Sequence, residues 1–143
     1  MTVTYLDTSL LVAALTREPR TERAQKWLSA QPLQALSISD WVITEFSAAL
    51  SLKVRMKQLR PVHRADALAA FTALAEESLS VLPLSRLDFR TAARFADQHG
   101  RGLRAGDALH LAVAANHGTR LLSLDRTQVE AAKALGVSAS LFS

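Results

Sequence analysis

The stretch VTYL (residues 3–6) decides the fold class, because this short apolar run ends at the carboxylate of Asp7. A run of this kind predicts a β-strand. The same pattern returns near the other end of the chain, where RLLSL (120–124) is followed directly by Asp125. Two more runs predict strands at ALSI (35–38) and SVLPL (80–84), and VSASL (137–141) would bring the number of strands from four to five.

Segments with a helical pattern separate these strands. We expect helices over about residues 10–15, 21–29, 40–57, 61–78, 86–98, 106–117 and 127–135. Ser85 and Asp88 have the spacing of a capping box at the start of one of them. Alternating strands and helices indicate an α/β fold, with helices on both faces of a parallel sheet. Ligands of such folds bind beyond the carboxyl ends of the strands, so acids that follow strands are candidate site residues.

The composition narrows the class of protein. With 143 residues the chain suits one domain, which we expect to span residues 1–143, and 49% of the residues are apolar. The absence of cysteine excludes disulfides and thiolate chemistry and fits the reducing cytoplasm. No segment has the pattern of a signal peptide or a membrane span. The net charge of +4 and the pI of about 10.1 favour an acidic partner such as nucleic acid.

Asp7 and Asp125 each allow two interpretations. The carboxyl ends of parallel strands meet at one edge of the sheet, so both side chains should point out of the same edge. Each aspartate also precedes a predicted helix, where an N-cap would explain it, and Gln128 suits such a cap at Asp125. For either residue taken alone, the two interpretations are equally good.

Glu45 is harder to explain as a structural residue. Its neighbours at helical spacing are all apolar, namely Trp41, Val42, Ala48 and Ala49. An ionised carboxylate on an apolar stripe is costly without a partner, and no basic residue lies between positions 27 and 52. Its partner must therefore be a distant arginine, an ion pair at the edge of the stripe, or a metal ion.

Asp107 opens a nearly all-apolar helix, where the helix dipole alone would favour an acid. Burial of that helix would also carry Asp107 inward. A single shared cause explains the four acids more economically than four separate ones, because carboxylates brought together repel unless a cation neutralises them. An all-oxygen ligand set suits Mg²⁺ or Mn²⁺, and the natural chemistry of such a centre is phosphodiester hydrolysis.

The four acids lie in motifs that resemble those of PIN-domain nucleases, and specifically those of VapC-type toxins from toxin–antitoxin pairs. The motifs are YLDTS (5–9), ITEF (43–46), GDALHLA (106–112) and LLSLD (121–125). Together with the helix spacing they extend the resemblance over essentially the whole chain. The resemblance implies a doubly wound, PIN-like three-layer α/β/α fold with a central parallel sheet of four or five strands.

The resemblance also implies a function. It implies a Mg²⁺- or Mn²⁺-dependent endoribonuclease, the toxin of a type II pair, whose catalytic and metal-binding residues are Asp7, Glu45, Asp107 and Asp125. Ser9 and Ser123 fall where the family often uses Ser or Thr to orient the site, although turn and cap hydroxyls explain them equally well. The implied partners are an RNA substrate, a small antitoxin that blocks the site, and a second copy of the chain.

Several basic residues are candidates for RNA contacts. Lys53, Arg55 and Lys57 belong to a run without an acid from 46 to 65, which also suits a solvated helix end. Arg101 and Arg104 precede Asp107 in a Gly-rich segment that either holds phosphate or forms a mobile loop. His110, one turn beyond Asp107, either faces the site or, as the pattern favours, packs as a neutral histidine between helices.

Two other classes fit poorly. An aspartate-nucleophile phosphatase needs a second acid two residues after Asp7, where Ser9 stands. A receiver domain needs an acceptor aspartate after a central strand, yet Ser85 follows the third predicted strand. A receiver domain also needs a lysine after a late strand, whereas Lys133 lies inside a predicted helix. The alternative that stays open is a non-catalytic PIN-like module that binds RNA or a partner and uses the acids to hold a structural metal.

Overall fold

Five parallel strands form the central sheet in a computed structural model that describes residues 2–32 and 34–143. Their order across the sheet is β3–β2–β1–β4–β5. The strands are β1 (Thr4–Leu6), β2 (Leu36–Ser39), β3 (Leu79–Leu82), β4 (Arg120–Ser123) and β5 (Ala139–Leu141). The chain moves outward from β1 to β3 and then returns to the other side of β1, so the strand order reverses between β1 and β4. Leu6 and Leu122 are in register across this pair, which places the two strand ends side by side.

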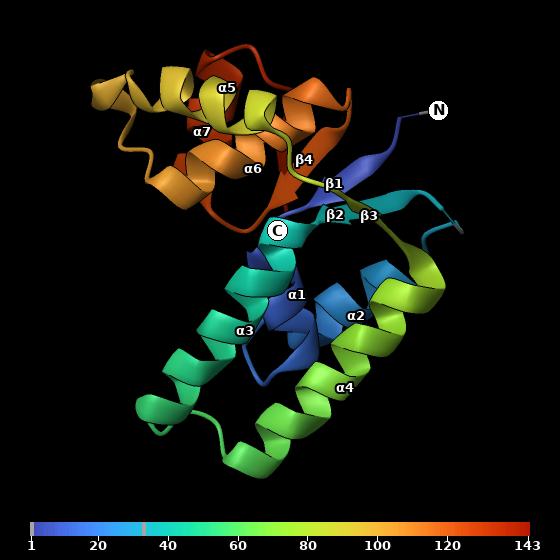
Figure 1. Cartoon of the computed structure of the whole chain (residues 1–143). Coiled ribbons are helices and arrows are strands. Elements are labelled where there is room, and N and C mark those ends of the chain that lie inside the picture. Colours follow the sequence, from blue (N-terminus) through green and yellow to red (C-terminus); the bar gives the residue numbers. More distant parts are fainter. Residues whose placement is uncertain (1, 33) are drawn as a thin grey trace.

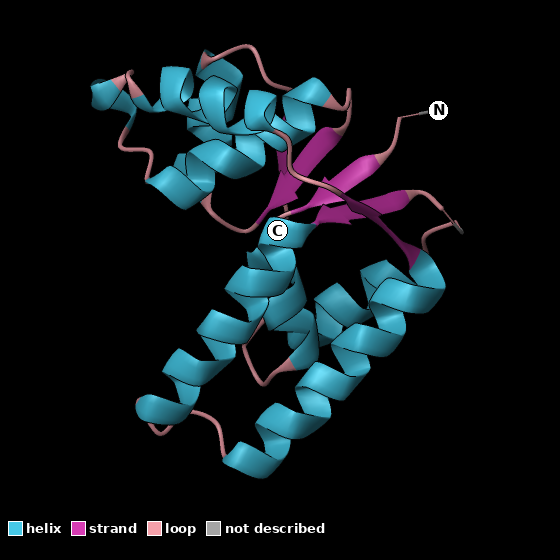
Figure 2. Ribbon diagram, in the orientation of Figure 1, coloured by secondary structure: helices cyan, strands magenta, loops and turns pink. Residues whose placement is uncertain are grey.

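Within the described residues, seven helices cover the sheet in two layers (Figure 1; Figure 2). One face carries α1 (Thr8–Leu15), α2 (Thr21–Ser29), α3 (Asp40–Arg55) and α4 (Pro61–Ser78). The other face carries α5 (Arg86–Ala96), α6 (Ala105–Asn116) and α7 (Arg126–Ala134), and a short 3-10 turn (His99–Arg101) joins α5 to α6. Right-handed crossovers explain the two layers, because reversing the direction of travel across the sheet moves the connecting helices to its other face. The predicted three-layer α/β/α fold with a parallel sheet is confirmed.

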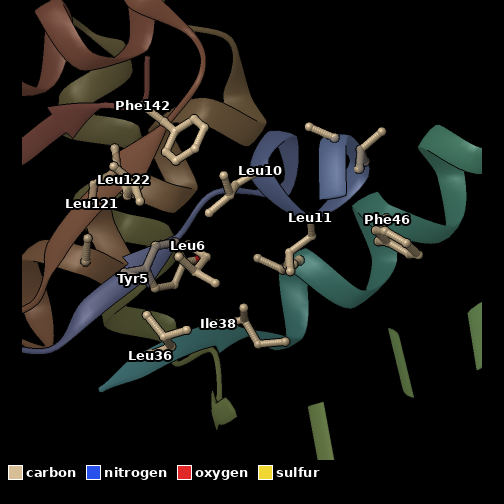
Figure 3. Close-up of a cluster of buried hydrophobic side chains, with 14 of the residues drawn as sticks. Tyr5, Leu6, Leu10, Leu11, Leu36, Ile38, Phe46, Leu121, Leu122 and Phe142 are labelled. Atoms are coloured by element: carbon tan, nitrogen blue, oxygen red, sulfur yellow. The ribbon is translucent and has the colours of Figure 1, made fainter. Parts of the chain in front are cut away.

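The apolar core fixes the helices that carry the site. Fully buried side chains of the central strands, among them Leu6 and Ile38, pack with Leu10 and Leu11 of α1 (Figure 3). On α3, Phe46 is fully buried and stacks on Phe71 of α4 with a centroid distance of 4.3 Å. Full burial of such a side chain stabilises a fold by about 1.5–3 kcal/mol. The residue before Phe46 is Glu45, so this contact also sets where that carboxylate lies.

The helix and strand boundaries differ from the sequence prediction at a few ends, each for a local reason. α1 begins at Thr8 rather than near residue 10, because Asp7 caps it. α3 ends at Arg55 rather than near residue 57, where Lys57 has a φ of 58° that a helix cannot accommodate. β3 ends before Pro83, which has no N–H to donate to a sheet.

The residues after α5 also differ from the prediction. α5 ends at Ala96, and the 3-10 turn that follows was not predicted. At the start of α5, Ser85 and Asp88 form the predicted capping box. Within residues 2–32 and 34–143, no helix combines the length and apolar character needed to cross a membrane.

Candidate active site

Asp7 and Asp125 lie at the same edge of the sheet, just beyond the adjacent strands β1 and β4. The backbone N–H of Asp7 donates to the carbonyl of Leu122 at 3.0 Å. Both aspartates are N-caps: Asp7 accepts from the N–H of Ser9, and Asp125 accepts from the N–H groups of Thr127 and Gln128. Their side chains also line one common cleft. The two interpretations left open by the sequence are therefore compatible.

Two serine hydroxyls hold the carboxylate of Asp7, which is 6% exposed. Ser9 Oγ donates to Asp7 Oδ2 at 2.6 Å, and Ser123 Oγ lies 3.0 Å from the same oxygen. The same hydroxyls accept from backbone N–H groups after β4, Ser9 from Leu124 at 3.2 Å and Ser123 from Asp125 at 3.0 Å. The two serines thus tie the ends of β1 and β4 together around Asp7.

Glu45 has its partner on a helix of the opposite layer, 65 residues away in the sequence. The Nε2 atom of His110 on α6 lies 2.5 Å from Glu45 Oε1 and 3.4 Å from Asp7 Oδ1. Thr8 Oγ1 donates to the same Glu45 oxygen at 2.7 Å. The partner that the sequence left undetermined is therefore a histidine. His110 is fully buried, but it faces the acids and its pKa is raised, so the interpretation that the sequence favoured, a neutral histidine packed between helices, is wrong.

The charges of His110 and Glu45 shift each other's pKa. Burial alone would lower the pKa of His110, but the hydrogen bond to Glu45 and the charges of Asp7 and Glu45 raise it overall. Burial alone would raise the pKa of Glu45, but the hydrogen bond and charge of His110 and the hydroxyl of Thr8 lower it overall. Both shifts favour the charged forms, as expected of an ion pair.

Asp107 lies in the first turn of α6 and is half-buried. Burial raises its pKa, and the negative charges of Asp7 and Asp125 raise it further. Repulsion of this kind requires the carboxylates to be close together, and a bound cation would relieve it. Asp125 is the most exposed of the four acids, at the solvent side of the group.

All four acids line one depression in the surface. A cleft of about 580 Å³ has Asp7, Glu45, Asp107 and Asp125 in its wall, and an adjoining cleft of about 570 Å³ shares the last three of them and adds Arg104. Ligand atoms of Asp7, Glu45 and His110 lie within 4.8 Å of one another. Among the described residues, Asp107 and Asp125 are not part of this close group, but they line the same cleft and add negative charge to it, and oxygen donors suit Mg²⁺ or Mn²⁺. The residues present therefore fit a divalent cation.

The basic residues singled out in the sequence are spread over different surfaces. Arg104 precedes α6 and lines the cleft beside Asp107, while Arg101 is exposed on the 3-10 turn. Lys53 forms an ion pair with Glu18 at 2.8 Å. Arg55 is exposed at the end of α3, and Lys57 lines a separate cleft that includes none of the four acids. Of the five, Arg104 is the residue that the structure places beside the acids.

Three residues outside the predicted site also touch it: Thr8 and Gly106 were not considered for it, and His110 was considered but not favoured. Thr8 and His110 bond to Glu45, and Gly106 lies against its other carboxylate oxygen. Thr8 follows Asp7 directly, and its proximity to the site was therefore available from the sequence. The contacts of His110 and Gly106 depend on how α6 packs near α3, which no local pattern predicts.

The cleft lies where the strand order of the parallel sheet reverses, and acids line it, so this is an α/β protein with an acidic cleft that fits a divalent cation. Comparison with known proteins identifies its family. A family model of the PIN domain matches residues 4–134. The match spans most of the chain, which therefore belongs to the PIN domain family. A search of curated proteins found no match.

Solved structures share the fold at low sequence identity. The FitAcB structure from Neisseria gonorrhoeae is 21% identical, with a TM-score of 0.69 and coverage of 96% of both chains. VapBC2 from Rickettsia felis, bound to a promoter DNA fragment, is 16% identical, with a TM-score of 0.69 and coverage of 99% of both chains. VapC20 of Mycobacterium tuberculosis, described as a sarcin-ricin loop cleaving toxin, is 20% identical, with a TM-score of 0.69 over 94% of this chain and 95% of that chain. At these identities the likeness shows the fold alone.

Proposed function

We propose that this protein is a metal-dependent endoribonuclease and the toxin of a type II toxin–antitoxin pair. The observation that carries the proposal is the cleft lined by Asp7, Glu45, Asp107 and Asp125, with Arg104 at its border. Membership of the PIN domain family supports nuclease chemistry. The sarcin-ricin loop cleaving toxin among the structural neighbours supports RNA as the substrate.

The four acids are the residues that would hold Mg²⁺ or Mn²⁺. Such an ion supplies a Lewis acid that activates water and stabilises the charge developing on the attacked phosphate. Asp7 Oδ2 accepts from the Ser9 hydroxyl and from the Ser9 N–H and lies 3.0 Å from Ser123 Oγ, so Asp7 would define the position of the ion most rigidly. Glu45 has a lowered pKa and stays ionised as a ligand. Arg104 is exposed beside these acids, where its guanidinium would bind a phosphate of the RNA backbone.

In-line attack by water breaks the bond between phosphorus and the 3′-oxygen, and that oxygen takes up a proton. The products therefore carry a 5′-phosphate and a 3′-hydroxyl. The test is incubation of total cellular RNA with the purified protein in Mg²⁺ and in EDTA. We expect cleavage with the metal and none in EDTA. Cyclic or 3′-phosphate ends, or full activity in EDTA, would contradict the mechanism.

Two variants make this test specific for the cleft. Asp7→Asn should abolish cleavage, because it removes a charge from the centre of the site. Glu130→Gln is the matched control, since Glu130 is an exposed acid of α7 that does not line the cleft, and this variant should retain full activity. Binding of RNA and Mn²⁺ by the wild type without any cleavage would instead support the alternative, a non-catalytic module with a structural metal.

The toxin part of the proposal predicts a protein inhibitor. A Klebsiella pneumoniae toxin–antitoxin complex is among the structures with this fold, at 20% identity and a TM-score of 0.58. A pocket of four carboxylates also suits an arginine or lysine side chain from a partner. Expression of this chain alone in the bacterial cytoplasm should arrest growth, and Asp7→Asn should relieve the arrest. Growth unaffected by an active wild-type chain would reject the toxin role but leave the nuclease role intact.

The proposed assembly is a homodimer, in line with the resemblance to VapC-type toxins. Sedimentation or light scattering of the purified chain should give about twice the mass of 15.5 kDa. A monomer at all concentrations would reject this part of the proposal without affecting the cleavage assay.

A further inference from the structure

We propose that Glu45 is held in place by a clamp of three positioning residues, Thr8, His110 and Gly106, and that the site depends on this clamp. Thr8 and His110 bond to one carboxylate oxygen, while Gly106 leaves room for the other. The inference rests on the proposed function in that it assigns these residues a role in holding a metal-binding acid.

The first side of the clamp acts on Glu45 Oε1. Thr8 Oγ1 donates to this oxygen at 2.7 Å, and His110 Nε2 lies within hydrogen-bond distance of it. Thr8 comes from α1 and His110 from α6, so the donors reach Glu45 from the two opposite helix layers. A glutamate side chain that stood alone on α3 would sample several rotamers. Two donors on one oxygen select one of them.

His110 is itself fixed from behind. Its Nδ1 atom lies 2.8 Å from the hydroxyl of Tyr5, which lies 2.7 Å from Ser39 Oγ. In the charged form of His110 both ring nitrogens are donors, so Nδ1 donates to the Tyr5 hydroxyl, Tyr5 donates to Ser39 Oγ, and Nε2 donates to Glu45. Tyr5, Ser39 and His110 are all fully buried, so the chain of hydrogen bonds is shielded from water. The strands β1 and β2 thereby set the orientation of the imidazole.

On the second side of the clamp, Gly106 leaves the space that Glu45 Oε2 occupies, because glycine has no side chain. A Cβ atom built on Gly106 would lie 2.8 Å from Glu45 Oε2 and 3.4 Å from the Trp41 indole. Glycine weakens a helix relative to alanine, yet it stands in the first turn of α6 without a positive φ that would require it. The contact with Glu45 explains the glycine. Because Oε1 is already held by two donors, Glu45 has little freedom to move away from an added methyl group.

This arrangement predicts a specific effect on chemistry. A metal ligand displaced by a fraction of an ångström holds its ion in the wrong place, while distant contacts to the RNA are unchanged. Loosening the clamp should therefore lower kcat and weaken metal binding with little change in KM. A residue that only stabilises the fold would instead lower the melting temperature, and its loss would leave the folded fraction fully active.

The sharpest test compares Gly106→Ala with Gly100→Ala. Gly100 lies on the 3-10 turn with nothing within 4 Å of an added Cβ, so it is a matched control for the loss of a glycine. Gly100→Ala should melt at or above the wild-type temperature, because alanine restricts the unfolded chain, whereas in Gly106→Ala the close contact with Glu45 offsets that gain. We expect Gly106→Ala to lower kcat by about 10-fold to 100-fold with an unchanged KM. Gly100→Ala should match the wild type, and equal kcat values for the two variants would overturn the clamp.

A second pair of variants separates positioning by His110 from direct metal binding. His110→Gln retains a donor near the position of Nε2, whereas His110→Leu removes it. We expect the glutamine variant to recover at least about 5-fold in kcat over the leucine variant, because a hydrogen-bond donor is what the clamp needs. Equal losses in both variants would indicate that His110 is a metal ligand and would overturn its positioning role. If His110→Leu does not fold, the glycine pair still decides the proposal.

Binding of Mn²⁺ in the absence of RNA, measured by isothermal titration calorimetry, tests the clamp independently of RNA cleavage. Gly106→Ala should bind Mn²⁺ more weakly, with a dissociation constant about 10-fold higher than that of Gly100→Ala. If Gly106→Ala binds Mn²⁺ more weakly than Gly100→Ala and the wild type binds Mn²⁺ but cuts no RNA, the clamp is supported and the nuclease proposal is rejected. A wild type that cuts RNA while both glycine variants bind Mn²⁺ equally would reject the clamp alone. Absence of Mn²⁺ binding by the wild type would also overturn it, since the clamp holds Glu45 for that ion.

Discussion

Asp125 provides a direct test of whether one side chain can serve as both a helix cap and a metal ligand. Its Oδ1 accepts from the N–H of Thr127 at 3.0 Å and from the N–H of Gln128 at 3.3 Å. Asparagine has an equivalent oxygen and caps helices about as well, whereas alanine has none and costs about 0.5–2 kcal/mol. Replacement by each of the two residues therefore separates the cap from the charge.

The expected changes in melting temperature follow from the size of the chain. In EDTA, Asp125→Ala should lose about 1 kcal/mol, or roughly 2–4 °C. Asp125→Asn should melt at or slightly above the wild type, because it retains the cap and relieves the repulsion that raises the pKa of Asp107. Mg²⁺ at about 100 times its dissociation constant should stabilise the wild type by about 2.7 kcal/mol, or roughly 5–11 °C. Both variants should lose most of this gain.

The assay is a set of thermal melts, followed by circular dichroism, for the wild type and both variants in EDTA and in Mg²⁺. Glu130→Gln is the control, because it removes an exposed charge from the same helix without touching the cap or the cleft. The reasoning is refuted if Asp125→Asn keeps the full metal-induced shift, since Asp125 would then play no part in metal binding. It is also refuted if Asp125→Asn melts as low as Asp125→Ala in EDTA, because the cap would then not explain the stability.

Three other predictions address different parts of the site. Asp107→Asn should raise the melting temperature in EDTA at pH 7, because its pKa is raised in the folded state and its charge is therefore unfavourable there. The gain should vanish at a pH below the ordinary aspartate pKa, where the carboxyl is protonated in both states; a gain that is independent of pH would point to a cause other than charge. Ser123→Ala should lower the free energy of unfolding in urea by about 1–3 kcal/mol and should also lower cleavage, because Asp7 and the Asp125 N–H both lose a partner. An unchanged free energy of unfolding would mean that this hydroxyl holds neither group. Arg104→Ala should raise KM for RNA and Lys57→Ala should not, since Arg104 alone of the two lines the acidic cleft; equal KM values would place the RNA elsewhere.

The fold could be predicted from the sequence because its signals are local. The apolar runs that become β1 and β4, and the helical spacing between the strands, depend on neighbouring residues only. The placement of Asp7 and Asp125 at one edge follows from the parallel sheet without knowledge of side-chain packing. Element ends were less predictable, since they depend on single features such as the positive φ of Lys57.

The contacts within the site could be predicted only in part. The sequence showed that Glu45 needed a partner and that the partner was not local, which left a distant arginine, an ion pair at the edge of the stripe, or a metal ion. It could not indicate that His110 is that partner, because the contact joins helices on opposite faces of the sheet. The same holds for Gly106, which the sequence placed at the start of the helix predicted over residues 106–117 without indicating that it lies against Glu45.

The structural and functional interpretations of Asp7 and Asp125 turn out to have one physical origin. A helix that follows a parallel strand begins at the carboxyl edge of the sheet, and its first N–H groups need an acceptor there. The aspartate that supplies this acceptor has a second oxygen, which the helix does not use. Two such strands side by side, as β1 and β4 are, bring two of these oxygens to one edge. Capping therefore favours a metal site rather than competing with it, because the backbone N–H groups that fix each carboxylate also offset part of its charge until a cation binds.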